Sequence, residues 1–187
     1  MGALHIRYPA PTSTQLSVAV LAMGVVVLSS NILVQFAIND WLTWGAITYP
    51  FAFLVSELVN RAFGPGQARR VAWVGFAVAV VASAVLAPVR IAAASGLAFL
   101  CAQMLDIAVF DRLRQSRWWR APLIATALAA VLDTAVFWGV GFAGEDLPWI
   151  TWALGDLGVK LVMAVCLLLP FRLLISPRLL SNPPPQH

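Results

Sequence analysis

Long uninterrupted runs of apolar residues constrain this chain more than any other feature of its sequence. The first run extends from Leu16 to Ile38, and a helix of about 20 apolar residues is enough to cross a bilayer. The apolar core of a secretory signal has only about 7–15 residues, so this run is interpreted as a retained membrane span. Hydrophobic residues make up 61% of the chain and charged residues 11%. Because soluble domains have roughly 45–50% and about 25%, the composition excludes a soluble globular fold, a disordered chain and a coiled coil.

Six apolar segments follow one another and predict an all-α membrane protein. We expect spans at about 16–38, 44–63, 71–89, 92–113, 121–143 and 149–175. Together they would form a single domain over residues 1–175, a compact bundle of six transmembrane helices. Residues 176–187 would be a Pro-rich cytoplasmic tail. Pro170 is expected to disturb the last span, because proline removes one backbone hydrogen bond from a helix.

Basic residues are distributed unevenly between the two sides of this predicted bundle. One side would hold Arg7, Arg61, Arg69, Arg70, Arg112, Arg114, Arg117, Arg120, Arg172 and Arg178. The other side would hold only Arg90, together with Asp40, Glu145 and Asp146. Because cytoplasmic loops are enriched in Lys and Arg, both termini are predicted to be cytoplasmic, N-in and C-in. The net charge of +4 then reflects arginines at the membrane surface, and nucleic acid is not predicted as a partner.

Ionisable residues also lie inside the predicted spans; they are Glu57, Asp106, Asp133, Asp156 and Lys160. Each costs about 2.5–3.5 kcal/mol at the centre of a span when isolated, so they must face the bundle interior, pair, or line a wet cavity. Counting about 1.5 Å of depth per residue places Asp133 and Lys160 together near the midplane, as the leading candidate for a buried ion pair. Local pairs at four-residue spacing, Asp156 with Lys160 and Glu57 with Arg61, are the alternatives. Four acids against one base leave negative charge that protons, water or a substrate must offset.

Amide side chains and a proline add to these polar groups. Asn31 and Gln35 share one face of the first span, and Gln103 shares a face of the fourth span with Asp106. Such amides either bind a substrate or hold helices together. Pro50 precedes the acid of the second span by two turns. It marks either a broken helix that lines a substrate path or an ordinary first helical turn.

The cysteines and histidines exclude several classes of chemistry. Cys101 and Cys166 lie in apolar runs, without the spacing of a disulfide framework or a metal site. His5 and His187 stand near the two ends of the chain, so no histidine is left for a nucleophilic pair or a proton relay within the membrane. The sequence also lacks a Walker A loop. We therefore predict a protein that is not an enzyme and that uses no metal and no cofactor.

Several short motifs extend from the first span to the last. In chain order they are Ser29-Ser30-Asn31, Val34-Gln35, Thr43-Trp44-Gly45-Ala46, Tyr49-Pro50-Phe51, Phe53-Leu54, Glu57, Arg61, Phe63-Gly64, Ala68-Arg69-Arg70, Gln103, Leu105-Asp106, Val109-Phe110, Arg112-Leu113-Arg114, Trp118-Trp119, Ala121-Pro122, Asp133-Thr134 and Lys160. This combination resembles the queuosine precursor transporter family of bacterial inner-membrane proteins, also described as vitamin-uptake-transporter-like. The chain departs from the family pattern at Glu57, where several relatives are expected to have aspartate. It also departs just before Asp133, where a more polar sequence is expected.

The resemblance implies an inner-membrane importer of queuosine precursors, the bases 7-cyano-7-deazaguanine and 7-aminomethyl-7-deazaguanine. It also implies a six-helix fold similar to the substrate-binding subunits of energy-coupling-factor transporters. A guanine-like base presents adjacent N–H donors for a carboxylate, a ring carbonyl that needs a donor, and a flat face for an aromatic ring. The candidate substrate-binding residues are Asn31, Gln35, Phe53, Glu57, Gln103, Asp106, Asp133 and Lys160, with Tyr49 and Trp138 as candidates for stacking.

Three alternatives share part of this pattern. A substrate-binding subunit for another vitamin would have the same fold and would work with a separate energising module. An intramembrane enzyme would need an aspartate cluster or a nucleophile beside a histidine, which the sequence lacks. A purely structural membrane protein would not retain so many buried charges. The sequence leaves open the energy source and whether the lipid-embedded chain forms homo-oligomers.

Overall fold

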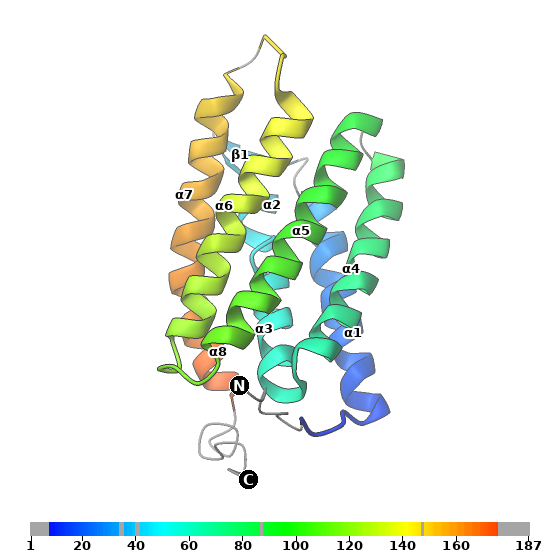
Figure 1. Cartoon of the computed structure of the whole chain (residues 1–187). Helices are drawn as coiled ribbons and strands as arrows, with labels where there is room; N and C mark the ends of the chain where they lie inside the picture. Colours follow the sequence, from blue (N-terminus) through cyan, green and yellow to red (C-terminus); the bar gives the residue numbers. More distant parts are fainter. Residues whose placement is uncertain (1–7, 34–35, 40–41, 87, 147, 176–187) are drawn as a thin grey trace, which may run out of the picture.

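The computed structural model describes residues 8–33, 36–39, 42–86, 88–146 and 148–175, which form an elongated bundle of helices (Figure 1). In chain order the elements are α1 (Ser13–Leu33), β1 (Ala37–Asn39), β2 (Leu42–Thr43), α2 (Trp44–Thr48), α3 (Phe51–Phe63), α4 (Pro65–Leu86), α5 (Val89–Leu113), α6 (Arg120–Phe142), α7 (Trp149–Cys166) and α8 (Leu168–Leu174). Helix α5 packs against both α4 and α6, and α6 packs against α7. The predicted Pro-rich tail lies outside the described residues.

Four stretches of helix are long and apolar enough to cross a membrane. They are α1, α5, α6 and the stretch Trp149–Leu174 formed by α7 and α8. Large apolar side chains point outward from these helices; the exposed fractions of Leu21, Leu154 and Leu173 are 67%, 66% and 75%. An apolar exterior of this extent suits lipid and not water. The chain is therefore a mostly helical, multi-pass membrane protein. The other two predicted spans correspond to α2 with α3, and to α4.

The first helix is shorter than predicted and is followed by two short strands. Helix α1 ends at Leu33 instead of Ile38, and Ala37–Asn39 pairs antiparallel with Leu42–Thr43. Asn39 is followed in the sequence by an aspartate, and both residue types favour turns over a continuing helix. The prediction that the chain is purely α-helical is thus wrong for this small hairpin.

Two prolines divide predicted spans into shorter helices. In the second span, α2 ends at Thr48 and α3 begins at Phe51, with Pro50 between them. Proline has no N–H, so the helical bond to the carbonyl four residues earlier cannot form. Pro170 acts in the same way in the last span, where α7 ends at Cys166 and α8 begins two residues later. The predicted disturbance at Pro170 is therefore present, and it begins one turn earlier in the chain.

The connections between helices separate into two ends of the bundle. The start of α1, the α3–α4 turn, the α5–α6 connection and α8 lie at one end, and the α4–α5 and α6–α7 connections lie at the other (Figure 1). At the first end Gly64 has a φ of 84°, and a Cβ there would lie 2.5 Å from the ring of Tyr8. At the other end Arg90 pairs with Glu145 at 2.7 Å and donates to the carbonyl of Ala143 at the end of α6, where a cation is favourable. The arginines of α3, α4, α8 and the last turn of α5 thus share one end, and Arg90 in the first turn of α5 lies at the opposite end.

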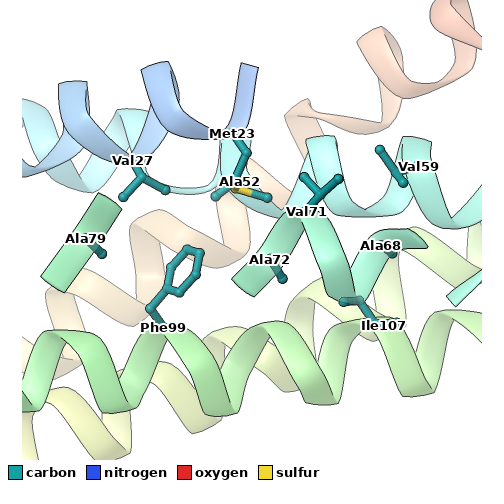
Figure 2. Close-up of a cluster of buried hydrophobic side chains, with 10 residues drawn as sticks. All are labelled: Met23, Val27, Ala52, Val59, Ala68, Val71, Ala72, Ala79, Phe99 and Ile107. Carbon is teal, nitrogen blue, oxygen red and sulfur yellow. The ribbon is translucent and has the colours of Figure 1, made fainter. Parts of the chain in front are cut away.

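A hydrophobic core holds α1, α3, α4 and α5 together (Figure 2). Its buried members are Met23, Val27, Ala52, Val59, Ala68, Val71, Ala72, Ala79, Phe99 and Ile107. The alanines among them allow neighbouring helices to approach closely. At Gly75 of α4 a Cβ would lie only 2.6 Å from Cγ of Met23. The core fixes α3 against α5, and these two helices carry part of the candidate site.

Candidate functional site

Two polar layers lie one after the other along the axis of the bundle, with an apolar layer between them. We call the first the ion network; it consists of Tyr49, Asp133, Thr134, Trp138, Asp156 and Lys160. The second, the carboxyl layer, consists of Ser56, Glu57, Gln103, Asp106 and Thr126. Helical spacing sets their order, because Tyr49, Phe53 and Glu57 follow one another at intervals of four residues on a single face. On α6 the two layers are carried by Asp133 and Thr126, about two turns apart.

Lys160 of α7 is the centre of the ion network and is only 5% exposed. Its Nζ lies 2.7 Å from Oδ2 of Asp133 on α6, and it also donates to Oδ2 of Asp156 one turn earlier on its own helix. Both partners that the sequence left open are therefore present at once. The other oxygen of Asp133, Oδ1, accepts a hydrogen bond from the Tyr49 hydroxyl at 2.7 Å. Asp133 is thus bound by Lys160 of α7 and by Tyr49, which lies in the turn between α2 and α3.

The second acid of the ion network has neutral donors in addition to the lysine. Oδ2 of Asp156 accepts from Oγ1 of Thr134 at 3.1 Å and lies 3.5 Å from Nε1 of Trp138. The Lys160 ammonium also stands 5.5 Å from the centre of the Tyr49 ring, a cation–π distance. Because one cation and several neutral donors serve both carboxylates, the network is satisfied without a ligand.

Beneath the ion network is the apolar layer, formed by Phe53, Ala102 and Ala129. All three side chains are buried, and the Phe53 ring meets the Tyr49 ring edge-on with centroids 5.8 Å apart. Phe53 comes from α3, Ala102 from α5 and Ala129 from α6, so the layer spans the interior between three helices. It separates the satisfied ion network from the acids below.

The carboxyl layer contains buried polar atoms without partners. Glu57 is 3% exposed, and its Oε1 accepts from Oγ1 of Thr126 at 2.7 Å. Ser56 donates to Oε1 of Gln103, but Nε2 of Gln103 and both oxygens of Asp106 have no hydrogen-bond partner among the described residues. Most buried polar groups in proteins are hydrogen-bonded, and each exception needs an explanation. This layer therefore differs from the ion network in having free acceptors and a free donor.

A third set of contacts closes the bundle below the carboxyl layer. Nδ2 of Asn60 donates to the carbonyl of Ile107 at 3.0 Å, and Nη1 of Arg61 donates to the carbonyl of Arg114 at 2.8 Å. Arg114 in turn donates to Oδ1 of Asn60 at 2.8 Å and pairs with Asp111. These bonds tie α3 to α5 at the arginine-rich end. Arg61 is engaged there, and the described residues show no Glu57–Arg61 ion pair.

The remaining predicted residues are placed less centrally. Asn31 is half-buried on α1, where its Nδ2 donates to the carbonyl of Val27 at 3.0 Å. Gln35 lies outside the described residues. Trp138 is part of an aromatic group with Phe142 and Trp152, at centroid distances of 4.8 and 6.1 Å. In the part of the chain that the structure describes, no cluster of His, Cys, Asp and Glu could hold a metal ion.

The sequence reasoning missed the hydroxyl residues that complete both layers. Thr126 and Thr134 of α6 donate to Glu57 and Asp156, and Ser56 of α3 donates to Gln103. Threonine and serine are common in apolar helices, where they often bond to their own backbone. Thr126 shares a helix face with Asp133 at a seven-residue spacing, but the sequence does not distinguish it from a threonine that bonds to its own backbone.

Comparisons with known proteins agree with one another. Residues 43–175 match a family model described as "Putative vitamin uptake transporter". This stretch contains every residue of the ion network and of the carboxyl layer, and it excludes Asn31 and Gln35 on or near α1. No solved structure matches the chain.

Curated relatives carry transporter names. The chain is 34% identical over 174 residues to the "Queuosine precursor transporter" of Escherichia coli (strain K12), covering 78% of this chain and 79% of that protein. It is also 34% identical over 163 residues to the "Probable queuosine precursor transporter" of Haemophilus influenzae, covering 72% and 69%. A protein of the same description from Bacillus subtilis is 26% identical over 130 residues, or 54% of this chain and 57% of that protein. All three relatives are transporters, in agreement with the prediction that the chain is not an enzyme.

Proposed function

Because this chain belongs to the vitamin uptake transporter family, we propose that it imports queuosine precursors across the bacterial inner membrane. The proposed substrates are 7-cyano-7-deazaguanine and 7-aminomethyl-7-deazaguanine. The names of the relatives support the substrate class, and the buried carboxyl layer supports a site for a polar base within the bundle.

The observation that carries this proposal is the set of unpartnered atoms in the carboxyl layer. Both oxygens of Asp106 and Nε2 of Gln103 are buried without a hydrogen-bond partner among the described residues. A guanine-like base has adjacent N–H donors beside a ring carbonyl. In the proposed complex the Gln103 amide donates to the ring carbonyl, and Asp106 accepts from an N–H group of the substrate that lies beside this carbonyl. The base would thus satisfy both the acceptors and the donor that the protein leaves free.

The other candidate residues have roles around this site. Phe53 would cover the flat face of the base from the apolar layer, since an aromatic ring can stack on the face of any nucleobase. The ion network with Asp133, Lys160 and Tyr49 would form the boundary of the substrate path on the side away from the arginine-rich end. Trp138 and Asn31 would line the path further from the base, and Gln35 lies outside the described residues.

The proposed orientation places both ends of the chain in the cytoplasm. The α3–α4 turn, the α5–α6 connection and α8 lie at one end of the bundle (Figure 1), and these segments, with the adjoining turns of α3 and α4, contain Arg61, Arg69, Arg70, Arg117 and Arg172. Arg90 pairs with Glu145 at the other end. Cytoplasmic segments near membrane spans are enriched in Arg and Lys. The carboxyl layer would then lie nearer the cytoplasm than the ion network does.

Equilibrium binding to the purified protein in detergent tests the proposed substrate. We expect both deazaguanines to bind and guanine to compete less well, because a wrong ligand leaves buried polar groups unpaired. Asp106→Asn and Gln103→Leu should weaken binding at least tenfold, at about 1.4 kcal/mol per factor of ten. Glu145→Gln, far from the layer, should bind normally. Binding of riboflavin or biotin without any deazaguanine would instead identify a subunit for another vitamin.

A further inference from the structure

The carboxyl layer holds two acids without a cation. Glu57 of α3 and Asp106 of α5 are 3% and 0% exposed. They are direct chain neighbours of Ser56 and Ile107, whose hydrogen bonds with Gln103 and Asn60 join α3 to α5. In contrast to the ion network, where Lys160 serves Asp133 and Asp156, no ion pair reaches either acid among the described residues. The layer therefore lacks at least one positive charge.

Several charged groups on α3, α5, α6 and α7 have partners other than these two acids. On α3, Arg61 donates to the carbonyl of Arg114, and on α5, Asp111 pairs with Arg114. On α6 and α7, Asp133 and Lys160 pair with each other beyond the Phe53 layer. Among these described groups, none compensates the two acids.

The hydrogen-bond donors near the two carboxyls are also too few to satisfy both of them. Thr126 faces both carboxyls, but a hydroxyl has one hydrogen, and its bond is to Oε1 of Glu57. Two carboxyl groups that share a buried site do not both ionise readily, because burial and the repulsion between like charges favour the protonated form. The carboxyl layer is therefore expected to retain a proton on Glu57 or Asp106.

We propose that Glu57 and Asp106 form a site for one positive charge, filled by a proton in the empty protein and by the ammonium group of the substrate in the complex. This inference rests on the proposed function for the identity of the second cation. An alkylammonium such as an aminomethyl group has a pKa near that of lysine, about 10, and stays charged near neutral pH. When it enters, the O–H bond of the protonated carboxyl breaks and the proton leaves to water, so the charge of the layer is unchanged. The neutral cyano precursor brings no charge, and the proton stays.

The exchange makes a quantitative prediction about pH. If binding of the aminomethyl precursor releases one proton, its Kd should fall about tenfold for each unit rise in pH from about 6 to 8. The Kd of the cyano precursor should change less than twofold over the same range. Glu57→Gln leaves a single acid and should flatten the slope for the aminomethyl precursor, whereas Glu145→Gln should keep it. Equal slopes for the two precursors, or a Kd for the aminomethyl precursor that ignores pH, would overturn the exchange.

A second measurement examines the retained proton without any substrate. Infrared spectra of the purified empty protein at neutral pH should contain the carbonyl band of a buried protonated carboxyl group. The band should disappear in Glu57→Gln/Asp106→Asn and remain in Thr126→Val, which disturbs the same layer but keeps both acids. A band that persists in the double variant, or that is absent from the unmodified protein, would contradict the site. If no deazaguanine binds while the band behaves as expected, the proposed substrate fails and the proton site stands.

Discussion

Lys160 pairs with the buried Asp133 and the half-buried Asp156, and this makes it the most sensitive side chain of the ion network. Removing one partner of a buried ion pair costs about 3–5 kcal/mol, because a charge is left uncompensated. Lys160→Met should therefore be the most severe single change, followed by Asp133→Asn. The smaller effect is expected for Asp156→Asn, whose side chain is 16% exposed. Thermal unfolding of the purified variants in detergent measures these differences.

The network also predicts which combined change restores stability. Asp133→Asn/Lys160→Met still leaves Asp156 without its cation, so it should recover stability only in part. The triple change with Asp156→Asn removes all three charges and should approach the unmodified protein in stability. If transport remains absent in the triple variant, the network also acts on the substrate path. Additive effects of Asp133→Asn and Lys160→Met would show that the two residues are not coupled.

Gly75 offers a test of the core that is independent of the polar layers. A Cβ at this position would lie 2.6 Å from Cγ of Met23 and 3.1 Å from Cζ of Phe99, so Gly75→Ala should cost about 1–3 kcal/mol. Gly139→Ala is the matched control, because a Cβ there has nothing within 4 Å. Gly139→Ala should be neutral or stabilising, because the helix propensity of alanine exceeds that of glycine by up to about 1 kcal/mol. Equal melting temperatures for the two variants would show that the α1–α4 contact is looser than described.

The sequence identified the buried charges more readily than their partners. Depth along the spans placed Asp133 and Lys160 at one level, and four-residue spacing placed Asp156 beside Lys160. The sequence therefore allowed either pair, and the structure contains both. Whether one or both pairs form depends on the rotation of α6 and α7 about their axes, and depth along the span does not specify this rotation. The hydroxyls of Thr126 and Thr134 have no distinctive pattern in an apolar helix, and their roles required the packed structure.

Pro50 separates α2 from α3 and sets the position of Tyr49 over Asp133. Replacing it by alanine restores an N–H and permits a continuous helix through residues 44–63. We expect Pro50→Ala to retain or increase stability and to reduce transport severalfold, because the Tyr49 hydroxyl would be displaced from Asp133. Pro170→Ala removes the break between α7 and α8, away from both polar layers, and should leave transport within about twofold of normal. The comparison needs uptake rates normalised to the amount of protein in the membrane. Normal transport by Pro50→Ala would contradict a role for this break.

Helices were predictable where the apolar run is long and its end is marked by proline or glycine. The predicted 121–143 span became α6 at Arg120–Phe142, and Gly64 followed by Pro65 marked the α3–α4 turn. The β1–β2 hairpin was not predictable, since its few residues show no alternation that separates them from the end of an apolar helix. Tertiary contacts decide such short elements.

The arrangement of the chain across the membrane can be tested by cysteine labelling. In a background with Cys101 and Cys166 replaced by alanine, we expect Ser116→Cys to react only after the membrane is opened. Asp146→Cys should react with an impermeant reagent in intact cells. The reason is the concentration of arginine at the end that carries the α5–α6 connection. Labelling of Ser116→Cys from outside would invert the orientation.

Import of a queuosine precursor is tested most directly in living cells. Bacteria that neither make nor import the precursors are given this chain and an external deazaguanine, and queuosine is measured in their tRNA. The account predicts that queuosine appears with the unmodified chain and with Glu145→Gln, and falls at least tenfold with Asp106→Asn at equal protein levels. Absence of queuosine with the unmodified chain present in the membrane, or equal queuosine with Asp106→Asn, would contradict it.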